Sequence, residues 1–441
     1  MSGWRTRLRS LAIDLGPLRR HRDFRLRTIA ASVSAFGAYF TMIAVPIQIM
    51  RLTGSTVAVG LVAAAEFFPI IAVGLLGGAV ADRFDRRKVV LISELGALGC
   101  TLALLGNSLL PEPRLWVIYL MAAGAVSASA MQRPSLDAML PRYVPHAEIP
   151  AASMVNNQAW GLAGIAGTTL GGVLASTSIS LAYAVDVASF ALSLLVFLRL
   201  TPLPRTLSTV VPGVRATLAS VGEGVRYALG RKDLLGTYLI DTIAMAMAMP
   251  MALFPFFAAE LHAPHAVGLL YAADSVGALL AGAVSGWIRR VHRHGLAIIV
   301  AALCWGAAIG LAGLMPNLGL VLLFLACAGA ADMVSGTFRA VIWDQTIPDE
   351  LRGRLAGIEL LSYSIGPTLG NARAGFMAVG GVRFAIASGG LLCVLGVGAA
   401  AAALPGFRAY DTRTDEFALA ERQRRSAPGA GSHTPPGGPS T

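Results

Sequence analysis

The sequence predicts an all-α membrane protein with about twelve transmembrane helices, arranged as two pseudo-symmetric halves of six. Of the 441 residues, 55% are apolar and only 13% are charged, whereas an ordinary soluble domain carries about 25% charged residues. Apolar runs long enough to cross a bilayer as helices recur along almost the whole chain. These runs lack the alternation typical of barrel strands, so helices are favoured.

The spans fall into two groups of six. They are residues 28–50, 57–81, 89–110, 115–132, 154–175 and 180–198 in the first half, and 236–259, 267–288, 296–315, 318–338, 355–379 and 384–404 in the second. The chain therefore divides into a basic N-terminal tail (1–27), a first half (28–199), a central connection (200–235), a second half (236–404) and a C-terminal tail (405–441).

The placement of basic residues predicts the topology. With the N-terminus in the cytoplasm, the outer loops contain only Arg51, Arg114 and Arg383, Arg373 falls within a span, and 31 of the 35 Lys and Arg face the cytoplasm. This asymmetry is the positive-inside rule, and it places both termini in the cytoplasm. The net charge of +11 then reflects topology and contact with lipid rather than a nucleic-acid-binding face.

The connection and the C-terminal tail have different compositions. Within residues 200–235, apolar residues recur at helical spacing, which predicts an amphipathic helix on the membrane surface. Residues 405–441 are rich in Pro, Gly, Ser and Arg, which predicts a disordered cytoplasmic tail.

Three pairs of segments indicate an internal duplication. LGGAVADRF is echoed by LAGAVSGWI, VPHAEIPAA by IPDELRGRL, and GTTLGG by GPTLGN, each about 200 residues further along. Paired six-helix halves suit alternating access, in which a ligand site between the halves opens to either side in turn.

The loop after the second span, GAVADRFDRRK, concentrates charge beside a glycine. We expect it to act as a conformational latch, in which an aspartate accepts hydrogen bonds at a neighbouring helix N-terminus and arginines anchor the loop. The alternative is a basic loop that only fixes topology. The latch residues are Gly78, Asp82, Arg83, Arg86 and Arg87.

GAVADRFDRRK resembles the signature loop of the major facilitator superfamily, G-x-x-x-D-R-x-G-R-R, and departs from it at Asp85, where glycine is usual. The segments HRDFRLR, AVPIQIM, LLPEPRLWVIYL, GLLYAADSVGALLAG and IPDELRGRLAGI resemble its enterobactin exporter-like subfamily. The resemblance extends from about residue 20 to about residue 405. It implies the major facilitator fold and a proton-driven siderophore exporter in a bacterial inner membrane. A multidrug or antibiotic efflux pump is the alternative.

Glycines in the fifth and eleventh spans form a second pattern. Small residues four apart allow helices to cross closely, and the pattern resembles the exporter motif G-P-x-x-G-G, with Thr168 at the proline position. Ordinary helix packing is the alternative. The residues concerned are Gly164, Gly167, Gly171 and Gly172 in span five, and Gly366, Pro367 and Gly370 in span eleven.

Acidic residues within spans are costly to bury and are therefore candidates for proton coupling. The candidates are Glu66, Asp241, Asp332 and Asp274, with a helix-to-helix hydrogen bond as the alternative for each. The resemblance favours Asp241 and Asp332, because the first, fourth, seventh and tenth helices line the cavity in that fold. We expect Glu94 to partner the arginine loop and Asp186 to lie near a helix end.

Other side chains could line a substrate pathway. Arg373 lies deep within a span, Met247 belongs to a run of alternating methionines, and Trp160 offers a stacking surface. Arg133 lies at the inner end of the fourth span, where extension to lipid headgroups is the simpler interpretation.

Several function classes are disfavoured. The two lysines, Lys88 and Lys232, do not form a phosphate-binding loop. The histidines and four cysteines form no metal-ligand or catalytic pattern, so we expect no enzyme activity, cofactor or metal. The expected partners are the lipid bilayer, protons and a small-molecule substrate, without nucleic acid, for a monomeric chain.

Overall fold

The computed structural model describes residues 15–202, 226–227, 230–347 and 364–426, and it describes residues 74–83, 232, 289 and 422–426 only as backbone. In these ranges the chain is helical and contains no strand. Eleven helical segments of the described residues are long and apolar enough to cross a membrane. Large apolar side chains point outward along them, including Phe68, Leu195 and Leu391, as expected for a surface that faces lipid.

The first half consists of seven α-helices and a short 3-10 helix. They are α2 (Gly16–Arg20), α3 (Arg22–Thr53), α4 (Thr56–Arg83), α5 (Arg86–Ser108), α6 (Leu115–Tyr143), η1 (His146–Glu148), α7 (Ile149–Thr177) and α8 (Ile179–Phe197).

The second half begins with a broken helix. Its elements are α10 (Lys232–Ala248), η2 (Met251–Leu253), α11 (Phe254–Glu260), η3 (Pro264–Ala266), α12 (Val267–Ala283), η4 (Ser285–Arg290), α13 (His294–Leu314), α14 (Leu318–Thr346), helical residues 364–377, η5 (Ala378–Gly380), α16 (Val382–Ala403), α17 (Pro405–Arg408) and α18 (Glu416–Ser426). Pro250 follows the end of α10, where its missing N–H and the extended Met249 interrupt the helix.

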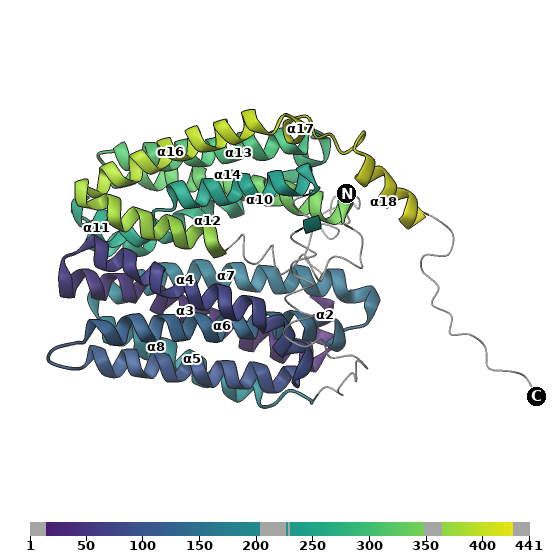
Figure 1. Ribbon diagram of the computed structural model, residues 1–441. Helices are drawn as coiled ribbons and strands as arrows, with labels where there is room; N and C mark the ends of the chain where they lie inside the picture. The colour runs from purple at the N-terminus through teal and green to yellow at the C-terminus, as the bar shows by residue number, and fades with distance from the viewer. Residues whose placement is uncertain (1–14, 203–225, 228–229, 348–363, 427–441) are drawn as a thin grey trace, which may run out of the picture.

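The two halves lie side by side and use the same helix pairings (Figure 1). In the first half α3 packs on α8, α5 on α6 and α8, and α4 on α6. The corresponding pairs in the second half are α10 with α16, α13 with α14 and α16, and α12 with α14. The duplication inferred from the sequence echoes therefore corresponds to a repeated helix arrangement.

The predicted spans and the observed helices differ mainly at their ends. The eleventh predicted span, 355–379, lies partly outside the described residues, and residues 364–377 of it are helical. Most of the amphipathic helix predicted in residues 200–235 also lies outside the described residues. The N-terminal tail ends earlier than predicted, because α3 begins at Arg22 and buries Arg27, whose guanidinium donates to Asn156 and to the carbonyl of Leu136.

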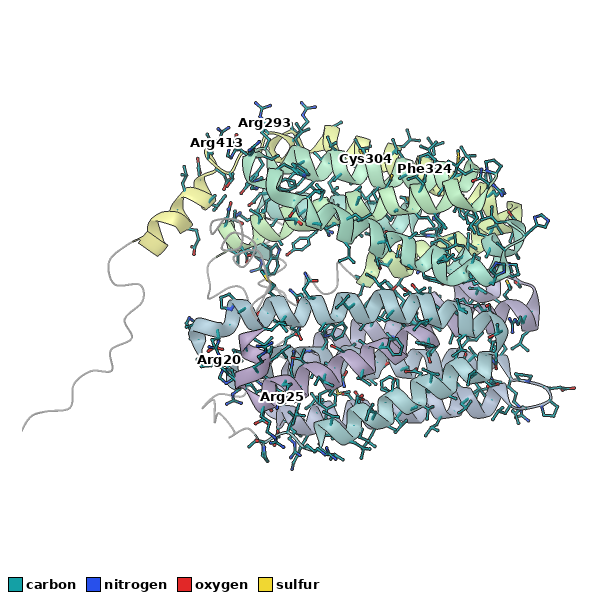
Figure 2. The ribbon with its side chains drawn as sticks, turned by 180° about the vertical axis from the view of Figure 1, so that it is seen from behind. Arg20, Arg25, Arg293, Cys304, Phe324 and Arg413 are labelled. Atoms are coloured by element: carbon teal, nitrogen blue, oxygen red, sulfur yellow. The ribbon has the colours of Figure 1, made fainter. Side chains whose placement is uncertain are left out.

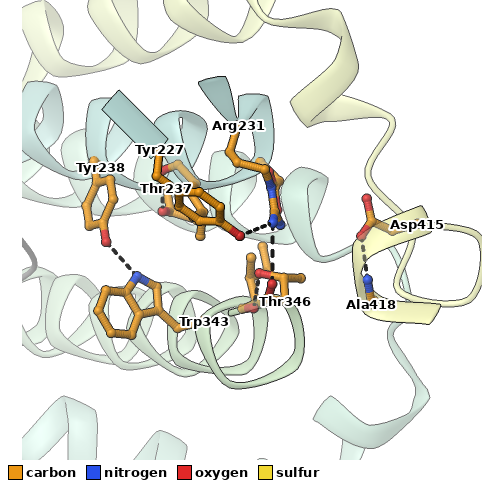
Figure 3. Close-up of polar contacts among 11 residues, drawn as sticks. Tyr227, Arg231, Thr237, Tyr238, Trp343, Thr346, Asp415 and Ala418 are labelled. Atoms are coloured by element: carbon orange, nitrogen blue, oxygen red, sulfur yellow. Dashed lines mark hydrogen bonds and ion pairs between the residues drawn. The ribbon is translucent and has the colours of Figure 1, made fainter. Parts of the chain in front are cut away.

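The C-terminal tail is a correction to the sequence prediction. Residues 405–426 include helices α17 and α18 rather than a disordered segment, whereas residues 427–441 lie outside the described residues. The Arg231 guanidinium explains part of this order, because it lies 3.4 Å from the ring centre of Phe417 on α18. The same guanidinium donates to the Tyr227 hydroxyl at 2.9 Å and to the Thr346 carbonyl at 3.4 Å (Figure 3). A composition-based prediction cannot anticipate such a tertiary contact.

Basic side chains of both halves gather at one end of the molecule, which we call the basic end. Arg20 and Arg25 of the first half and Arg293 and Arg413 of the second mark it in Figure 2. The helix α3 begins at this end, and α12 begins at the opposite end, because consecutive long helices alternate in direction.

The halves contact each other at the end opposite the basic end, through two glycine pairs. A Cβ at Gly172 on α7 would lie 2.0 Å from the Cα of Gly268 on α12. A Cβ at Gly375 would lie 2.6 Å from the Cα of Gly60 on α4. The two contacts occupy equivalent positions in the repeat, and each brings two backbones closer than any side chain would allow.

These contacts predict a position-specific effect within α7. Replacing Gly172 by leucine should destabilise the protein by about 1–3 kcal/mol, the usual cost of overpacking, and lower the thermal unfolding midpoint of the purified protein. Gly161→Leu is the matched control, because Gly161 is exposed on the same helix and has no atom within 4 Å of its would-be Cβ. Equal midpoints for the two variants would contradict the crossing.

Candidate functional site

A cavity with two adjoining lobes lies within the first half and reaches the second. The first lobe has a volume of about 400 Å³, and the second about 300 Å³. Helices α3, α4, α6 and α8 line both lobes. The side chains that line both lobes are Ala38, Met42, Val126, Ser129 and Phe190.

The first lobe carries one charged side chain among the described residues that line it. This is Arg133 on α6, whose guanidinium carbon lies 4.5 Å from the ring centre of Trp160 on α7. Arg133 also pairs with Asp137 at 3.6 Å, one helical turn further along α6. Trp160, predicted from the sequence as part of a substrate pathway, thus lies in a cavity wall, and Arg133 contacts it rather than only extending to lipid.

The second lobe is acidic and includes residues from both halves. Glu66 on α4 and Asp186 on α8 line it, together with Tyr271 and Asn371 of the second half. The Glu66 carboxylate makes no hydrogen bond or ion pair with any residue that the structure describes. Although α4 was expected only to flank the cavity, its Glu66 lines this lobe directly.

Asp186 is fully buried in the middle of α8, and its surroundings correct the expectation that it lies near a helix end. Its carboxylate accepts hydrogen bonds from Thr41 on α3 at 2.5 Å and from Thr101 on α5 at 3.3 Å. A Cβ at Gly37 would lie 1.7 Å from the Ser189 hydroxyl, so this glycine lets α3 approach the polar face of α8.

Glu94 on α5 is also fully buried, and its contacts correct the expectation that it partners the arginine loop. The carboxylate accepts hydrogen bonds from the Ser193 hydroxyl and the Gln132 amide. Gln132 lines the first lobe. Glu94 therefore belongs to the polar core of the first half, directly behind the cavity wall.

The second half contains a buried ion pair between α10 and α14. Arg339 lies 2.5 Å from Asp241, and both side chains are less than a tenth exposed. The same guanidinium lies 3.8 Å from Asp332, and Asp274 on α12 lies within electrostatic range of Asp332. The structure thus places Asp241 and Asp332 beside one arginine and Asp274 near Asp332, whereas Glu66 lies separately in the first half.

The predicted latch loop is described in part. The side chains of Gly78, Asp82 and Arg83 lie outside the described residues. Arg86 donates to the carbonyl of Ala138 at 3.0 Å, and Arg87 to that of Leu198 at 2.6 Å, so both anchor the loop to neighbouring helices.

Asp85, where the loop departs from the superfamily pattern, has a structural role. It is the N-cap of α5, and its carboxylate accepts the backbone N–H of Arg87 at 2.9 Å. Aspartate is a favoured N-cap residue because it satisfies an otherwise unpaired backbone donor. The acidic replacement is therefore compatible with this turn.

The glycine motif acts mainly within each half. Gly164, Gly167 and Gly171 of α7 face Tyr39, Phe36 and Phe40 of α3, and Gly172 alone of the four reaches the other half. In place of the motif proline, the Thr168 hydroxyl donates to the carbonyl of Gly164 at 2.8 Å. The corresponding Gly366 and Gly370, on either side of Pro367, pack against Met245 of α10.

Arg373 and Met247 lie outside the two lobes described above. The Arg373 guanidinium contacts the Met377 sulfur at 3.1 Å, and a Cβ at Gly389 on α16 would lie 2.5 Å from it. That Cβ would also lie 2.9 Å from the carbonyl of Met247. Both residues therefore lie where the helix of residues 364–377 meets α10 and α16.

The fold and the cavity define a multi-pass membrane transporter rather than an enzyme. The family model for transmembrane secretion effectors matches residues 12–423. The chain belongs to this family, within the major facilitator superfamily. It is 30% identical over 396 residues to the enterobactin exporter EntS of Escherichia coli O81, covering 88% of this chain and 93% of that protein. It is 28% identical to EntS of Citrobacter koseri, covering 83% and 88% of the respective chains.

Solved structures of distant relatives have the same fold. A transporter of the POT family in complex with 5-aminolevulinic acid has a TM-score of 0.69 at 12% identity, covering 88% of this chain and 97% of that chain. A bacterial homologue of the lysosomal transporter Spinster, in an inward-facing conformation, has a TM-score of 0.65 at 16% identity, covering 90% and 96%.

The buried ion pair predicts non-additive stability. Arg339→Met should cost about 3–5 kcal/mol, because it leaves the buried Asp241 without its cation. Adding Asp241→Asn to Arg339→Met should recover part of that loss, since the carboxylate closest to the missing guanidinium is then replaced by a neutral amide. Thermal unfolding of the purified variants measures both effects.

The pair Arg413–Asp411, at 3.0 Å, provides the control, because the Arg413 side chain is 60% exposed. Arg413→Met should change stability little, because solvent screens a surface ion pair. If the double variant were no more stable than Arg339→Met, the ion pair would not be the source of the loss.

Proposed function

We propose that the protein is a proton-coupled exporter of a siderophore, enterobactin-like or similar in chemistry, which works by alternating access. The observation that carries this proposal is the two-lobed cavity beside the contact between the halves. It combines apolar walls, an arginine–tryptophan pair, the hydroxyl-bound Asp186, and Glu66, which has no partner among the described residues. The similarity to exporters of enterobactin supports the choice of substrate class.

The proposed orientation places the basic end in the cytoplasm of a bacterium, with the helices in the inner membrane. The excess of arginine at that end, against few basic residues at the other, supports this orientation. The glycine pairs then close the outer side, and the conformation is inward-facing. In this state the cavity would accept its substrate from the cytoplasm.

The proposed coupling uses acids on both sides of the cavity. Glu66 lacks a protein partner among the described residues, so a proton or a substrate group is the ligand left for it. Asp241 and Asp332 share Arg339, and Asp274 lies within electrostatic range of Asp332. Protonation of one of them would redistribute the ion pairs between α10 and α14, and the loop containing Asp82 would latch the resulting state.

The proposed partners are the bilayer, protons and the small-molecule substrate. The chain would act as a monomer without a cofactor or metal, and it would not bind nucleic acid. The basic side chains at the cytoplasmic end would contact anionic lipid headgroups instead.

The second candidate function is export of drugs or antibiotics. The mostly apolar lining of both lobes favours this second candidate function. The flexible side chain of Met42 lines both lobes. Such a wall accepts ligands of varied shape.

A deletion strain distinguishes the two candidates. We expect less siderophore in the medium of the deletion strain under iron limitation, with unchanged susceptibility to a panel of drugs. Restoration of secretion by the plasmid-borne gene is the control. Unchanged secretion together with increased drug susceptibility would replace the siderophore proposal with drug efflux.

Proton coupling is tested with purified protein in liposomes. Glu66→Gln and Asp332→Asn should each abolish transport driven by a pH gradient while leaving downhill exchange of substrate, because an amide cannot take up a proton. A gradient of one pH unit supplies about 1.4 kcal/mol per proton, so the difference from the unmodified protein is measurable as accumulation.

Glu260→Gln is the matched control, because Glu260 pairs with Arg383 at 3.5 Å at the end opposite the basic end. It should retain gradient-driven transport. A Glu66→Gln or Asp332→Asn variant with unchanged dependence on pH would move the coupling site to another residue.

A further inference from the structure

We infer that the first lobe is a recognition subsite for an aromatic ring that carries an anionic oxygen group, with Arg133 binding the anion and Trp160 stacking on the ring system. This inference rests on the proposed function, since it assumes that the cavity holds a transported ligand. It adds the chemical class of the part of the substrate that enters this lobe.

The contact between Arg133 and Trp160 orients the Arg133 guanidinium so that it can bind a ligand. Arg133 lies over Trp160 at 4.5 Å, which fixes the plane of its donor groups. Asp137 contacts it at 3.6 Å through Nε, yet the Arg133 side chain remains 55% exposed. A planar guanidinium in this arrangement can donate two parallel hydrogen bonds to a carboxylate or bind a phenolate.

Among the described side chains that line the first lobe, Arg133 carries the one charge, and the Glu94 carboxylate lies behind the wall, bound to Gln132. Asp137 is shared by Arg133 and by Arg27, which lies 3.7 Å away and is 1% exposed. Arg27 is already bound to Asn156 and the carbonyl of Leu136. Two guanidinium groups therefore share one carboxylate, and Arg133 is the member of this group that reaches the cavity.

The rest of the lobe favours a flat, mostly apolar ligand. Aromatic side chains of Tyr39, Trp160 and Phe190 contribute to its walls. The hydroxyls of Ser34 and Ser129 also line it, and they are hydrogen-bonded to Glu94 and to the carbonyl of Ala125. The volume of about 400 Å³ accommodates a substituted aromatic ring, since small-molecule sites usually span about 300–1,000 Å³. A cationic ligand would meet the Arg133 charge, and an aliphatic acid would leave the aromatic surfaces unused.

The second lobe determines which way such a ligand would face. Glu66 and Asp186 line it, so an ionised anionic group is disfavoured there. The anionic end of the ligand would therefore lie against Arg133, and neutral or hydroxyl-bearing parts would extend past Phe190 into the second lobe.

Calorimetric titration of the full-length protein in nanodiscs tests the subsite with three probes. These are 2-hydroxybenzoate, its uncharged amide, and cyclohexanecarboxylate, which keeps the charge and lacks the ring. We expect 2-hydroxybenzoate to bind at least about tenfold more tightly than either of the others, because hydrogen bonds to charged groups and aromatic stacking each contribute on this scale. Absence of 2-hydroxybenzoate binding to the unmodified protein would overturn the inference.

Variants assign the two parts of the recognition. Arg133→Gln should weaken 2-hydroxybenzoate binding about tenfold or more and leave the amide unchanged, whereas Arg133→Lys should retain part of the preference for charge. Trp160→Leu should remove the preference for the aromatic probe, and Trp160→Phe should keep it.

Arg383→Gln is the matched control, because Arg383 also lies over an aromatic ring, Phe257 at 5.5 Å, and pairs with an acid, Glu260. It lies outside both lobes and should not affect binding. An equal loss in Arg383→Gln, or an unchanged preference in Arg133→Gln of normal thermal stability, would overturn the subsite. If binding follows these expectations but the deletion strain secretes siderophore normally, the subsite stands and the siderophore proposal fails.

Discussion

The close approach of two backbones at Gly172–Gly268 and Gly60–Gly375 is the contact on which the arrangement of the halves depends. In a bilayer, apolar side chains gain nothing by leaving lipid for a neighbouring helix, so association relies on close van der Waals contact and on hydrogen bonds. Glycine supplies the closest contact possible. Because both pairs lie at the same end, they join the halves there and leave the cavity beside them, which is the asymmetry that alternating access requires.

The two halves use different chemistry to bury acidic groups, although their helices pack alike. In the first half, Glu94 and Asp186 are bound by hydroxyl and amide donors, and neither contacts a cation among the residues that the structure describes. In the second half, Asp241 is bound by Arg339. A hydroxyl-bound carboxyl can exist in either protonation state with its donors in place, whereas an arginine favours the ionised form. Duplication thus preserved the backbone arrangement and allowed the polar interiors to diverge.

The sequence predicts the fold well because transmembrane order is encoded locally. The apolar runs predicted the eleven spans that the structure describes. The repeated motifs predicted that the two halves resemble each other. Contacts between distant segments were not predictable in this way. The order of residues 405–426 depends on Arg231 contacting Phe417, and the placement of Glu94 depends on Ser193, which is 99 residues away. Neither partner has a periodic or compositional signal.

The candidate site illustrates the same limit. Charge within a span was sufficient to select Glu66 and Asp241 as candidates, because such charges are rare in membranes, and their role in coupling stays a prediction. Arg133 lies near the end of its predicted span, where arginines commonly extend to headgroups, and sequence position cannot distinguish that role from contact with a neighbouring helix. Its stacking on Trp160 depends on how α6 and α7 pack. The two residues are 27 positions apart in sequence, so only the folded chain brings them together. The first lobe then has a positive side chain in its wall and the second lobe has acidic ones. This difference in charge between the lobes is a property of the tertiary structure alone.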